Sequence, residues 1–439
     1  MILRDPVHGL VSFEGERERV IKRLLATREV QRLRRIRQLG LASQVFPGAE
    51  HSRFAHALGT AHVMGKLLDR IGTVEHAIAK EERLDAVACR DALAAALLHD
   101  LGHGPFSHLF EEVFADAPRH EDWTCALILD PGTEVHAALE DFGHGTAERV
   151  AALVRGEHRL AYLGHAVSGS LDVDRCDYLL RDSHMTGVRY GIFDLEWLLR
   201  ALSFSEVTEA DGRRSTVLAV EGRKGLPPIE GFFLARNFMY QQVYHHKAVR
   251  AAEVLVRAIF ARSTELLRDC HELGGNLPEA FTTVARAEKP SLRAYVELDD
   301  ASLTAAIASL QKARDPILRD LCDRLLTRTL PKTIPLADTP EAEPSWHAAH
   351  ARAAEIASRR GYRPDLYVWL DVPSDIPYAE SEEPRAKALW VARRHRPLAR
   401  LGEVSFLLRE LRNKRALRPR LIFPAELRDE ISAAIESLA

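Results

Sequence analysis

The chain has 439 residues, enough to bury a large core, and its 60 basic and 63 acidic residues give a net charge of −3. This balance excludes a generally basic surface, so we expect neither a nucleic acid nor a membrane as a partner. Five widely spaced cysteines without a CxxC pair do not indicate a disulfide framework, and they favour a reduced, cytoplasmic setting. The longest apolar run, residues 92–98, is too short to cross a bilayer, and the charged first ten residues do not resemble a secretory signal.

Apolar periodicity predicts helices along the first two-thirds of the chain. Residues 29–39 carry apolar side chains at every third position, with an arginine-rich outer face. Residues 51–71 continue the pattern up to Gly72, which is a candidate C-cap. Residues 85–99 are apolar on most faces, so we expect a buried central helix there.

Two further helices, over residues 171–182 and 230–260, are predicted on either side of a β-hairpin. The hairpin is expected over residues 204–220, because the strand-like residues there surround an Asp211-Gly212 turn. No internal repeat and no long low-complexity tract interrupts the chain.

From about residue 331 the composition changes, because prolines recur and two strand-like runs follow, over residues 366–372 and 387–394. A last helix is predicted from Pro424 onward. We therefore predict a mainly α fold, in which a helical core with a short β-hairpin (1–330) precedes a smaller α+β lobe (331–439).

Four residues offer a binding site for one divalent metal ion: His56, His99, Asp100 and Asp174. Neutral imidazoles with two carboxylates form a mixed nitrogen and oxygen site that suits Mn, Fe, Ni or Zn, whereas Mg is a less natural occupant. Two carboxylates offset the charge of a divalent cation, and open positions remain for water and a phosphate oxygen.

The His99-Asp100 pair opens the string HDLGHGPFSH, which holds three histidines in ten residues. A lone His-Asp dipeptide carries little information, but no packing or solubility requirement places three histidines at the end of an apolar helix. Glycines within the string predict a sharp backbone turn that points His103 and His108 back toward the metal. The string therefore indicates metal-dependent chemistry.

The segment LLHDLGHGPFSH (97–108) resembles a motif of the HD-domain phosphohydrolases, and in particular of the deoxynucleoside triphosphate triphosphohydrolases. Further segments resemble motifs of that family in the same order: DPVHG (5–9), QRLRRIRQLG (31–40), VFPGAEHSRF (45–54), HSRFAHALG (51–59), HE (120–121) and LDVDRCDYLLRD (171–182). The similarity covers about the first 260 residues. It implies a helical HD-domain core, a homo-oligomer, and hydrolysis of a dNTP to deoxynucleoside and triphosphate.

The resemblance assigns roles residue by residue. It implies four metal ligands, namely His56, His99, Asp100 and Asp174. It also implies a neighbouring catalytic group made of His103, His108, Glu111 and His120. Within this group we expect His108 to protonate the departing oxygen. Glu111 stands where the family usually has Asp, so its partnership with His120 involves a longer side chain.

Arginines near the metal ligands are candidates for binding phosphates. Arg53 precedes His56 by three residues, so the two face the same way on a helix, and its guanidinium suits a phosphate oxygen. The resemblance implies Arg175 as a second phosphate contact, at a position where relatives often carry Lys.

Other candidates would bind the sugar and the base. Tyr178 and Asp182 continue the helical face of Asp174, and the resemblance implies Asp182 as the acceptor for the 3′-OH. It also places Gln38 and Leu39 near the base and sugar. A third set of candidates consists of Arg236, Tyr240 and Tyr244. Their spacing alone favours an aromatic face packed in the core, whereas the resemblance implies that the Arg236 and Tyr244 positions line the substrate pocket.

Two alternatives stay open. The same metal site would serve another nucleotide, such as a nucleoside monophosphate, a cyclic nucleotide or a guanosine alarmone. A non-catalytic nucleotide or nucleic-acid sensor is the second alternative, for which the stretch RLRRIR (32–37) would bind a single strand. A solvated helix face explains that stretch more simply, and the complete set of metal ligands favours an enzyme.

Overall fold

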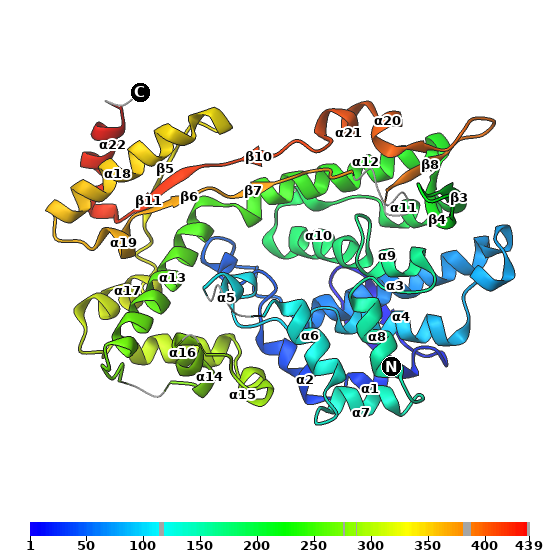
Figure 1. Cartoon of the computed structure of the whole chain (residues 1–439), viewed down its shortest axis with the longest axis horizontal. Coiled ribbons are helices and arrows are strands. Elements are labelled where there is room, and N and C mark those ends of the chain that lie inside the picture. The colour runs from blue at the N-terminus through cyan, green and yellow to red at the C-terminus, as the bar shows by residue number, and fades with distance from the viewer. Residues whose placement is uncertain (114–117, 275–276, 287, 381–387, 437–439) are drawn as a thin grey trace.

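The computed structural model describes residues 1–439 apart from 114–117, 275–276, 287, 381–387 and 437–439. The fold is mainly α, as predicted, with short strands in small sheets. In Figure 1 the blue and cyan helices form the lower right of the molecule, and the orange C-terminal segment runs across the top. None of the described helices combines the length and the apolar composition that crossing a membrane requires.

Three helices form the centre of the molecule: α3 (Arg53–Val74), α4 (Ala86–Leu98) and α10 (Val173–Thr186). α4 confirms the buried helix predicted over residues 85–99. The Asp85 carboxylate caps it by accepting from the Ala88 N–H, and residues 92–98 are completely buried. α3 packs against both α4 and α10, so side chains from three helices can meet at one place.

Several predicted helix boundaries differ from the structure, including that of 171–182, which is α10 over Val173–Thr186. α3 continues through Gly72 to Val74, because one glycine inside a helix costs only about 1 kcal/mol relative to alanine. The helix predicted over residues 29–39 ends early, as α2 (Arg28–Arg32) and η1 (Leu33–Arg35). A backbone bridge between Arg37 and Ser52 then replaces the helical hydrogen bonds and sets this loop against the start of α3.

The helix predicted over residues 230–260 is interrupted. α12 (Gly222–Met239) leads into one π-helical turn, η6 (Tyr240–Tyr244), and α13 (Lys247–Arg268) follows. Such single π-turns occur frequently at functional sites. In Figure 1 α12 lies along the top of the molecule, and α13 descends from its end.

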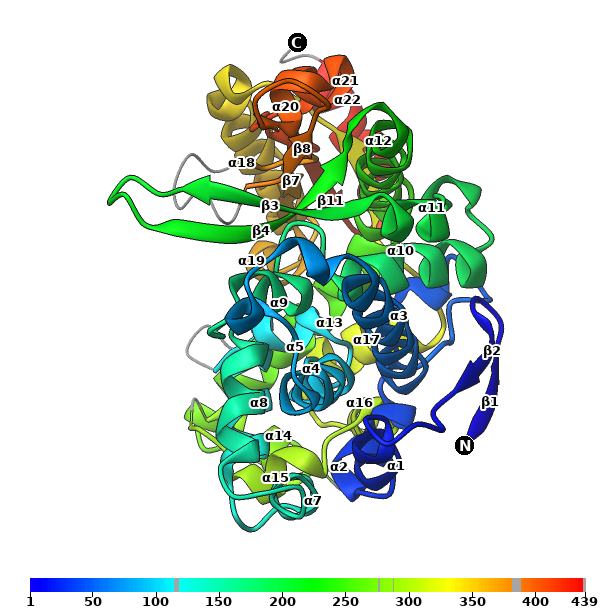
Figure 2. The same ribbon diagram turned by 90° about the vertical axis from the view of Figure 1, so that its right-hand side faces the viewer.

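Short helices surround the centre: α1 (Arg19–Leu24), α5 (His108–Val113), α6 (His120–Leu129), α7 (Glu134–Glu140), α8 (Thr146–Val154), α9 (Ala161–Val167), α11 (Leu195–Arg200), α14 (Glu279–Ala285), α15 (Leu292–Val296), α16 (Asp300–Leu310) and α17 (Pro316–Leu326). The N-terminus forms an antiparallel pair, β1 (Ile2–Asp5) and β2 (Gly9–Ser12), which lies beside α3 in Figure 2.

The predicted hairpin is confirmed, with β3 (Leu202–Thr208) and β4 (Arg214–Glu221) paired antiparallel around the turn at Gly212. β8 (Trp390–Ala392), from the far end of the chain, pairs in parallel with β4, and β9 (Ala399–Arg400) completes this sheet. Residues 390–392 therefore pack directly against the hairpin.

Other C-terminal residues form a separate three-stranded sheet of β5 (Lys332–Pro335), β11 (Arg420–Phe423) and β6 (Trp369–Asp371). The run predicted as a strand over 366–372 begins with a helical turn, α19 (Pro364–Tyr367). Of the strand predicted over 387–394, residue 387 lies outside the described residues. The remaining α-helices and strands of the described residues are α18 (Glu343–Arg359), β7 (Ser374–Asp375), α20 (Leu401–Val404), α21 (Phe406–Leu411), β10 (Ala416–Leu417) and α22 (Arg428–Glu436).

Candidate active site

The loop between α4 and α5 turns sharply, as predicted, but its glycines are not the residues with unusual backbone angles. Phe106 and Ser107 have φ of 57° and 60°, a region that residues other than glycine rarely adopt. Gly102 serves close packing instead, because a Cβ there would collide with the backbone of His120 and Thr124. The loop thus lies tightly against α6.

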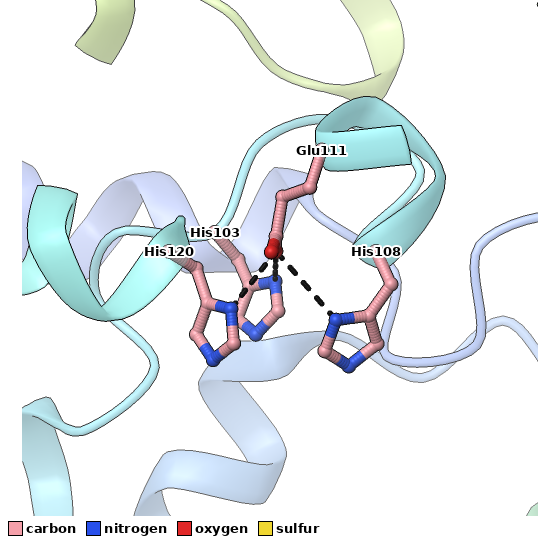
Figure 3. Close-up of side chains that lie close together, drawn as sticks. All are labelled: His103, His108, Glu111 and His120. Atoms are coloured by element: carbon pink, nitrogen blue, oxygen red, sulfur yellow. Dashed lines mark hydrogen bonds and ion pairs between the residues drawn. The ribbon is translucent and has the colours of Figure 1, made fainter. Parts of the chain in front are cut away.

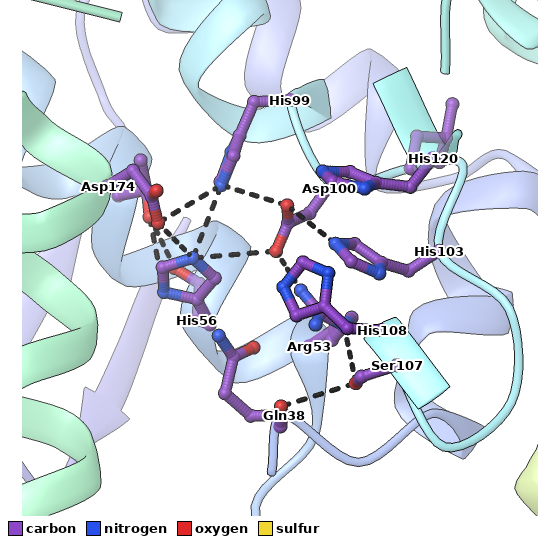
Figure 4. Close-up of polar contacts among 12 residues, drawn as sticks. Gln38, Arg53, His56, His99, Asp100, His103, Ser107, His108, His120 and Asp174 are labelled. Atoms are coloured by element: carbon purple, nitrogen blue, oxygen red, sulfur yellow. Dashed lines mark hydrogen bonds and ion pairs between the residues drawn. The ribbon is translucent and has the colours of Figure 1, made fainter. Parts of the chain in front are cut away.

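Three predicted metal ligands converge from the three central helices, as Figure 4 shows. Nε2 of His56 lies 2.9 Å from Oδ1 of Asp174 and 3.3 Å from Nε2 of His99. The fourth, Asp100, borders the same point: its Oδ1 lies 3.4 Å from Nε2 of His99, and its Oδ2 pairs with Arg53. Two imidazole nitrogens and two carboxylates around one point fit a divalent ion.

The electrostatics of this group also suit a cation. Burial alone would lower the pKa of His56, but the carboxylates of Asp174 and Asp177 raise it to about 10. Burial would raise the pKa of Asp100, yet Arg53 and His99 hold it well below its usual range. The carboxylates are therefore charged, and they favour positive charge at the point where the ligand atoms meet.

The second predicted group meets around one carboxylate oxygen (Figure 3). Oε1 of Glu111 lies 2.9 Å from Nδ1 of His120, 3.5 Å from Nδ1 of His108 and 3.7 Å from Nδ1 of His103. The longer side chain of Glu111 therefore does reach His120. Burial would raise the pKa of Glu111, but hydrogen bonds from His108 and His120 lower it below its usual range.

His103 connects the two groups. Its Nε2 lies 3.3 Å from Oδ1 of Asp100, and its ring stacks on that of His120 with the centroids 3.8 Å apart. Burial, followed by the charge of Arg53, holds the pKa of His103 well below its usual range, so the ring is neutral. By contrast, the side chain of His108 is 67% exposed.

Members of both groups line one cavity of about 520 Å³, namely Asp100 and Asp174 of the first and His103, His108 and His120 of the second. Its walls hold most of the residues predicted to bind substrate, namely Gln38, Leu39, Arg53, Arg175, Tyr178, Asp182, Tyr240 and Tyr244. At one end the hydroxyl of Tyr244 donates to Oδ2 of Asp182 at 2.8 Å. Arg175, on the metal side, pairs with Asp172.

Arg236 is the predicted substrate residue that the structure does not bring into the lining of this cavity. Its guanidinium donates to both carboxylate oxygens of Asp375, at 2.8 and 3.0 Å, and to the carbonyl oxygens of Ile376 and Pro377. It lies over the ring of Tyr240, 4.5 Å from the centroid, so it supports the cavity wall from behind.

Asp177 is a residue of the site that the sequence patterns did not single out, although it lies within the motif LDVDRCDYLLRD. Its carboxylate accepts a hydrogen bond from Nδ1 of His56 at 2.8 Å, on the side of the ring away from Asp174. The spacing of three between Asp174 and Asp177, typical of one helix face, was the signal that could have revealed it.

Residues 53–182 match the HD domain family. The uncharacterized protein YwfO of Bacillus subtilis is 33% identical over 434 residues, which cover 97% of this chain and 92% of that protein. The chain belongs to the HD-domain family of phosphohydrolases.

Two further known proteins are similar to this chain. A phosphohydrolase of Bacteroides thetaiotaomicron has a crystal structure that superimposes with a TM-score of 0.78 at 25% identity, covering 96% of this chain and 99% of that one. Human deoxynucleoside triphosphate triphosphohydrolase SAMHD1 is 27% identical over 73% of this chain, and the match spans 52% of the human protein.

Proposed function

We propose that this HD-domain phosphohydrolase cleaves deoxynucleoside triphosphates to a deoxynucleoside and triphosphate in the presence of one divalent metal ion. One observation carries the proposal: a single cavity of about 520 Å³ is lined by two of the proposed metal ligands, Asp100 and Asp174, by arginines and by the Tyr244–Asp182 pair. This volume lies in the range of ligand pockets. Similarity to SAMHD1 supports the choice of substrate.

His56, His99, Asp100 and Asp174 would hold the ion, which when bound supplies a Lewis acid and an activated water. Arg53 and Arg175 would bind phosphate oxygens, because a guanidinium can donate two parallel hydrogen bonds to one phosphate.

His108 would give a proton from Nε2 to the departing sugar oxygen. Its Nδ1 lies 3.5 Å from Oε1 of Glu111, so the carboxylate would stabilise the protonated ring from the side opposite to Nε2. Glu111 also contacts His120, which fixes the carboxylate in position.

The sugar would lie at the Tyr244–Asp182 end of the cavity. We propose that Asp182 accepts a hydrogen bond from the 3′-OH, while the ring of Tyr244 and the side chain of Leu39 fill the space that a ribose 2′-OH needs. Homo-oligomerisation and a cytoplasmic location stay predictions of the sequence.

The decisive experiment incubates the purified protein with each dNTP and NTP, with Mn²⁺ or Mg²⁺, and resolves the products chromatographically. We expect deoxynucleoside and intact triphosphate from dNTPs. His99→Ala should lose bound metal and activity together, whereas His136→Ala, outside the cavity lining, should keep both. Release of orthophosphate, and not of intact triphosphate, from the dNTPs would contradict the proposal and would favour a phosphohydrolase with another nucleotide as its substrate. The absence of any turnover would favour a non-catalytic sensor.

A further inference from the structure

The N-terminal hairpin reaches the metal site from behind. The loop between β1 and β2 carries His8, and this pair of strands lies beside α3 (Figure 2). Oδ1 of Asp5 accepts from the backbone N–H groups of Val7 and His8, both at 2.9 Å, which fixes the loop. The His8 side chain is only 4% exposed, and it points at Asp177.

Asp177 connects this loop to a predicted metal ligand. Its Oδ2 lies 2.8 Å from Nδ1 of His56, and its Oδ1 lies 2.6 Å from Nε2 of His8. Arg181 donates to both oxygens, at 2.8 and 2.9 Å, and to Asp5 at 2.8 Å. Four donors thus hold one carboxylate that is completely buried.

These contacts determine how the His56 ring is protonated. An ionised carboxylate can only accept hydrogen bonds, so His56 and His8 must both donate to Asp177. The proton on Nδ1 is thus held by Asp177, so a metal ion that displaces the second proton of the ring would meet the lone pair of Nε2 at the point where His99 and Asp174 converge.

A glycine on α3 makes room for this arrangement. A Cβ on Gly59 would collide with the carboxylate of Asp177 and the guanidinium of Arg181. The absence of a side chain at this position of α3 therefore leaves room for the buried ion pair on α10.

We infer that His8 is a positioning residue for the metal site, because it holds Asp177 in the orientation that fixes the ring of His56. The inference rests on the proposed function in one respect, since it requires His56 to be a metal ligand. His8 does not line the cavity, so its effect must pass through Asp177.

Binding of Mn²⁺ to the full chain, measured by calorimetry and elemental analysis, tests this inference. His8→Leu should weaken Mn²⁺ binding roughly tenfold, because partners of metal ligands typically contribute ten- to a hundredfold. His8→Gln, whose amide nitrogen takes the place of Nε2, should restore most of the affinity. His62→Leu is the matched control. His62 lies on α3, and the centroid of its ring is 5.2 Å from that of His8, so the same substitution is made next to His8.

Equal Mn²⁺ affinity for His8→Leu and the wild type would overturn the inference and leave the proposed function standing. A wild-type chain that binds no divalent ion would overturn both. Metal binding with the expected effect of His8, but without nucleotide hydrolysis, would overturn the proposed function alone. If His8→Leu does not fold, His8→Asn, whose shorter amide cannot reach Asp177, replaces it in the comparison with His8→Gln.

Discussion

At the scale of single residues, Asp182 receives two hydrogen bonds inside the cavity wall. Tyr244 donates from its hydroxyl to Oδ2, and Nε2 of His51 contacts Oδ1, both at 2.8 Å. Burial, followed by the charge of Asp182, raises the pKa of Tyr244 well above its usual range, so the phenol keeps its proton. The ring is therefore held rigidly at the proposed sugar end.

Two substitutions of Tyr244 test the role of its ring and the role of its hydroxyl separately. If the ring excludes ribose, an unpaired 2′-OH costs about 1–3 kcal/mol, or roughly ten- to a hundredfold in kcat/KM for dGTP over GTP. Tyr244→Phe should keep this preference, whereas Tyr244→Ala should reduce it mainly by raising kcat/KM for GTP. Steady-state kinetics on both nucleotides measure the effect, and equal wild-type rates would refute it.

The sequence could predict the residues of this site whose spacing is local. The string HDLGHGPFSH places His99, Asp100, His103 and His108 within ten residues, and the structure brings them together. Arg236 shows the limit, because its partner Asp375 is 139 residues away and no local pattern announces the pairing. The resemblance placed Arg236 in the cavity, whereas the structure buries its charge behind the wall.

At the scale of elements, α13 brings an ionisable group to the wall of the cavity. Glu253 lies one turn after Arg250, and the two form an ion pair of 2.7 Å. Burial raises the pKa of Glu253 to about 7, an effect that Arg250 only partly offsets. Both residues line the cavity, so the charge of its wall changes near neutral pH.

Stability should follow this titration. The folded pKa of Glu253 lies above that of an unfolded glutamate, so the folded chain binds more protons between about pH 4.5 and 7. The free energy of unfolding should therefore fall as the pH rises through this window, by on the order of 2 kcal/mol from this residue. Urea unfolding gives the free energy of unfolding at pH 5 and at pH 7.5. The difference between these two values should be smaller in Glu253→Gln than in the wild type. An identical difference would refute this assignment.

The sequence could predict the position of a helix where its apolar pattern was strong. It could predict the end of a helix only where tertiary contacts did not end the helix early or interrupt it. Residues 85–99 combined a continuous apolar run with a capping aspartate, and α4 matches them. The π-turn η6 was not predictable, because residues 230–260 carry no break at its position. The bridge from Arg37 to Ser52, which ends the predicted helix at 29–39, likewise depends on a segment that the local pattern does not contain.

At the scale of the whole molecule, the C-terminal segment is tied to the helices that build the cavity. Asp375 on β7 pairs with Arg236 on α12, and the side chains are 9% and 13% exposed. Asp371 on β6 pairs with Arg250 on α13 at 2.7 Å. Two buried ion pairs thus fix α12 and α13 against strands from the last quarter of the chain.

Breaking the first of these pairs should destabilise the protein. Arg236→Ala or Asp375→Ala should each lower the free energy of unfolding by about 3 kcal/mol, because each leaves one buried charge unpaired. The double variant should lose less than the sum of the two. Arg352→Ala, in the exposed pair with Glu355, should change stability by at most about 1 kcal/mol. Chemical denaturation of the four variants gives these values, and a strictly additive double variant would contradict the pairing.

The parallel pairing of β8 with β4 bears on how the chain is made in the cell. About 170 residues separate these strands, which at 5–20 residues per second corresponds to roughly ten to thirty seconds of translation. Until β8 emerges from the ribosome, one edge of β4 has no neighbour, and an open edge can pair with another chain. The newly made protein therefore passes through an interval in which protection of this edge by a chaperone would matter most.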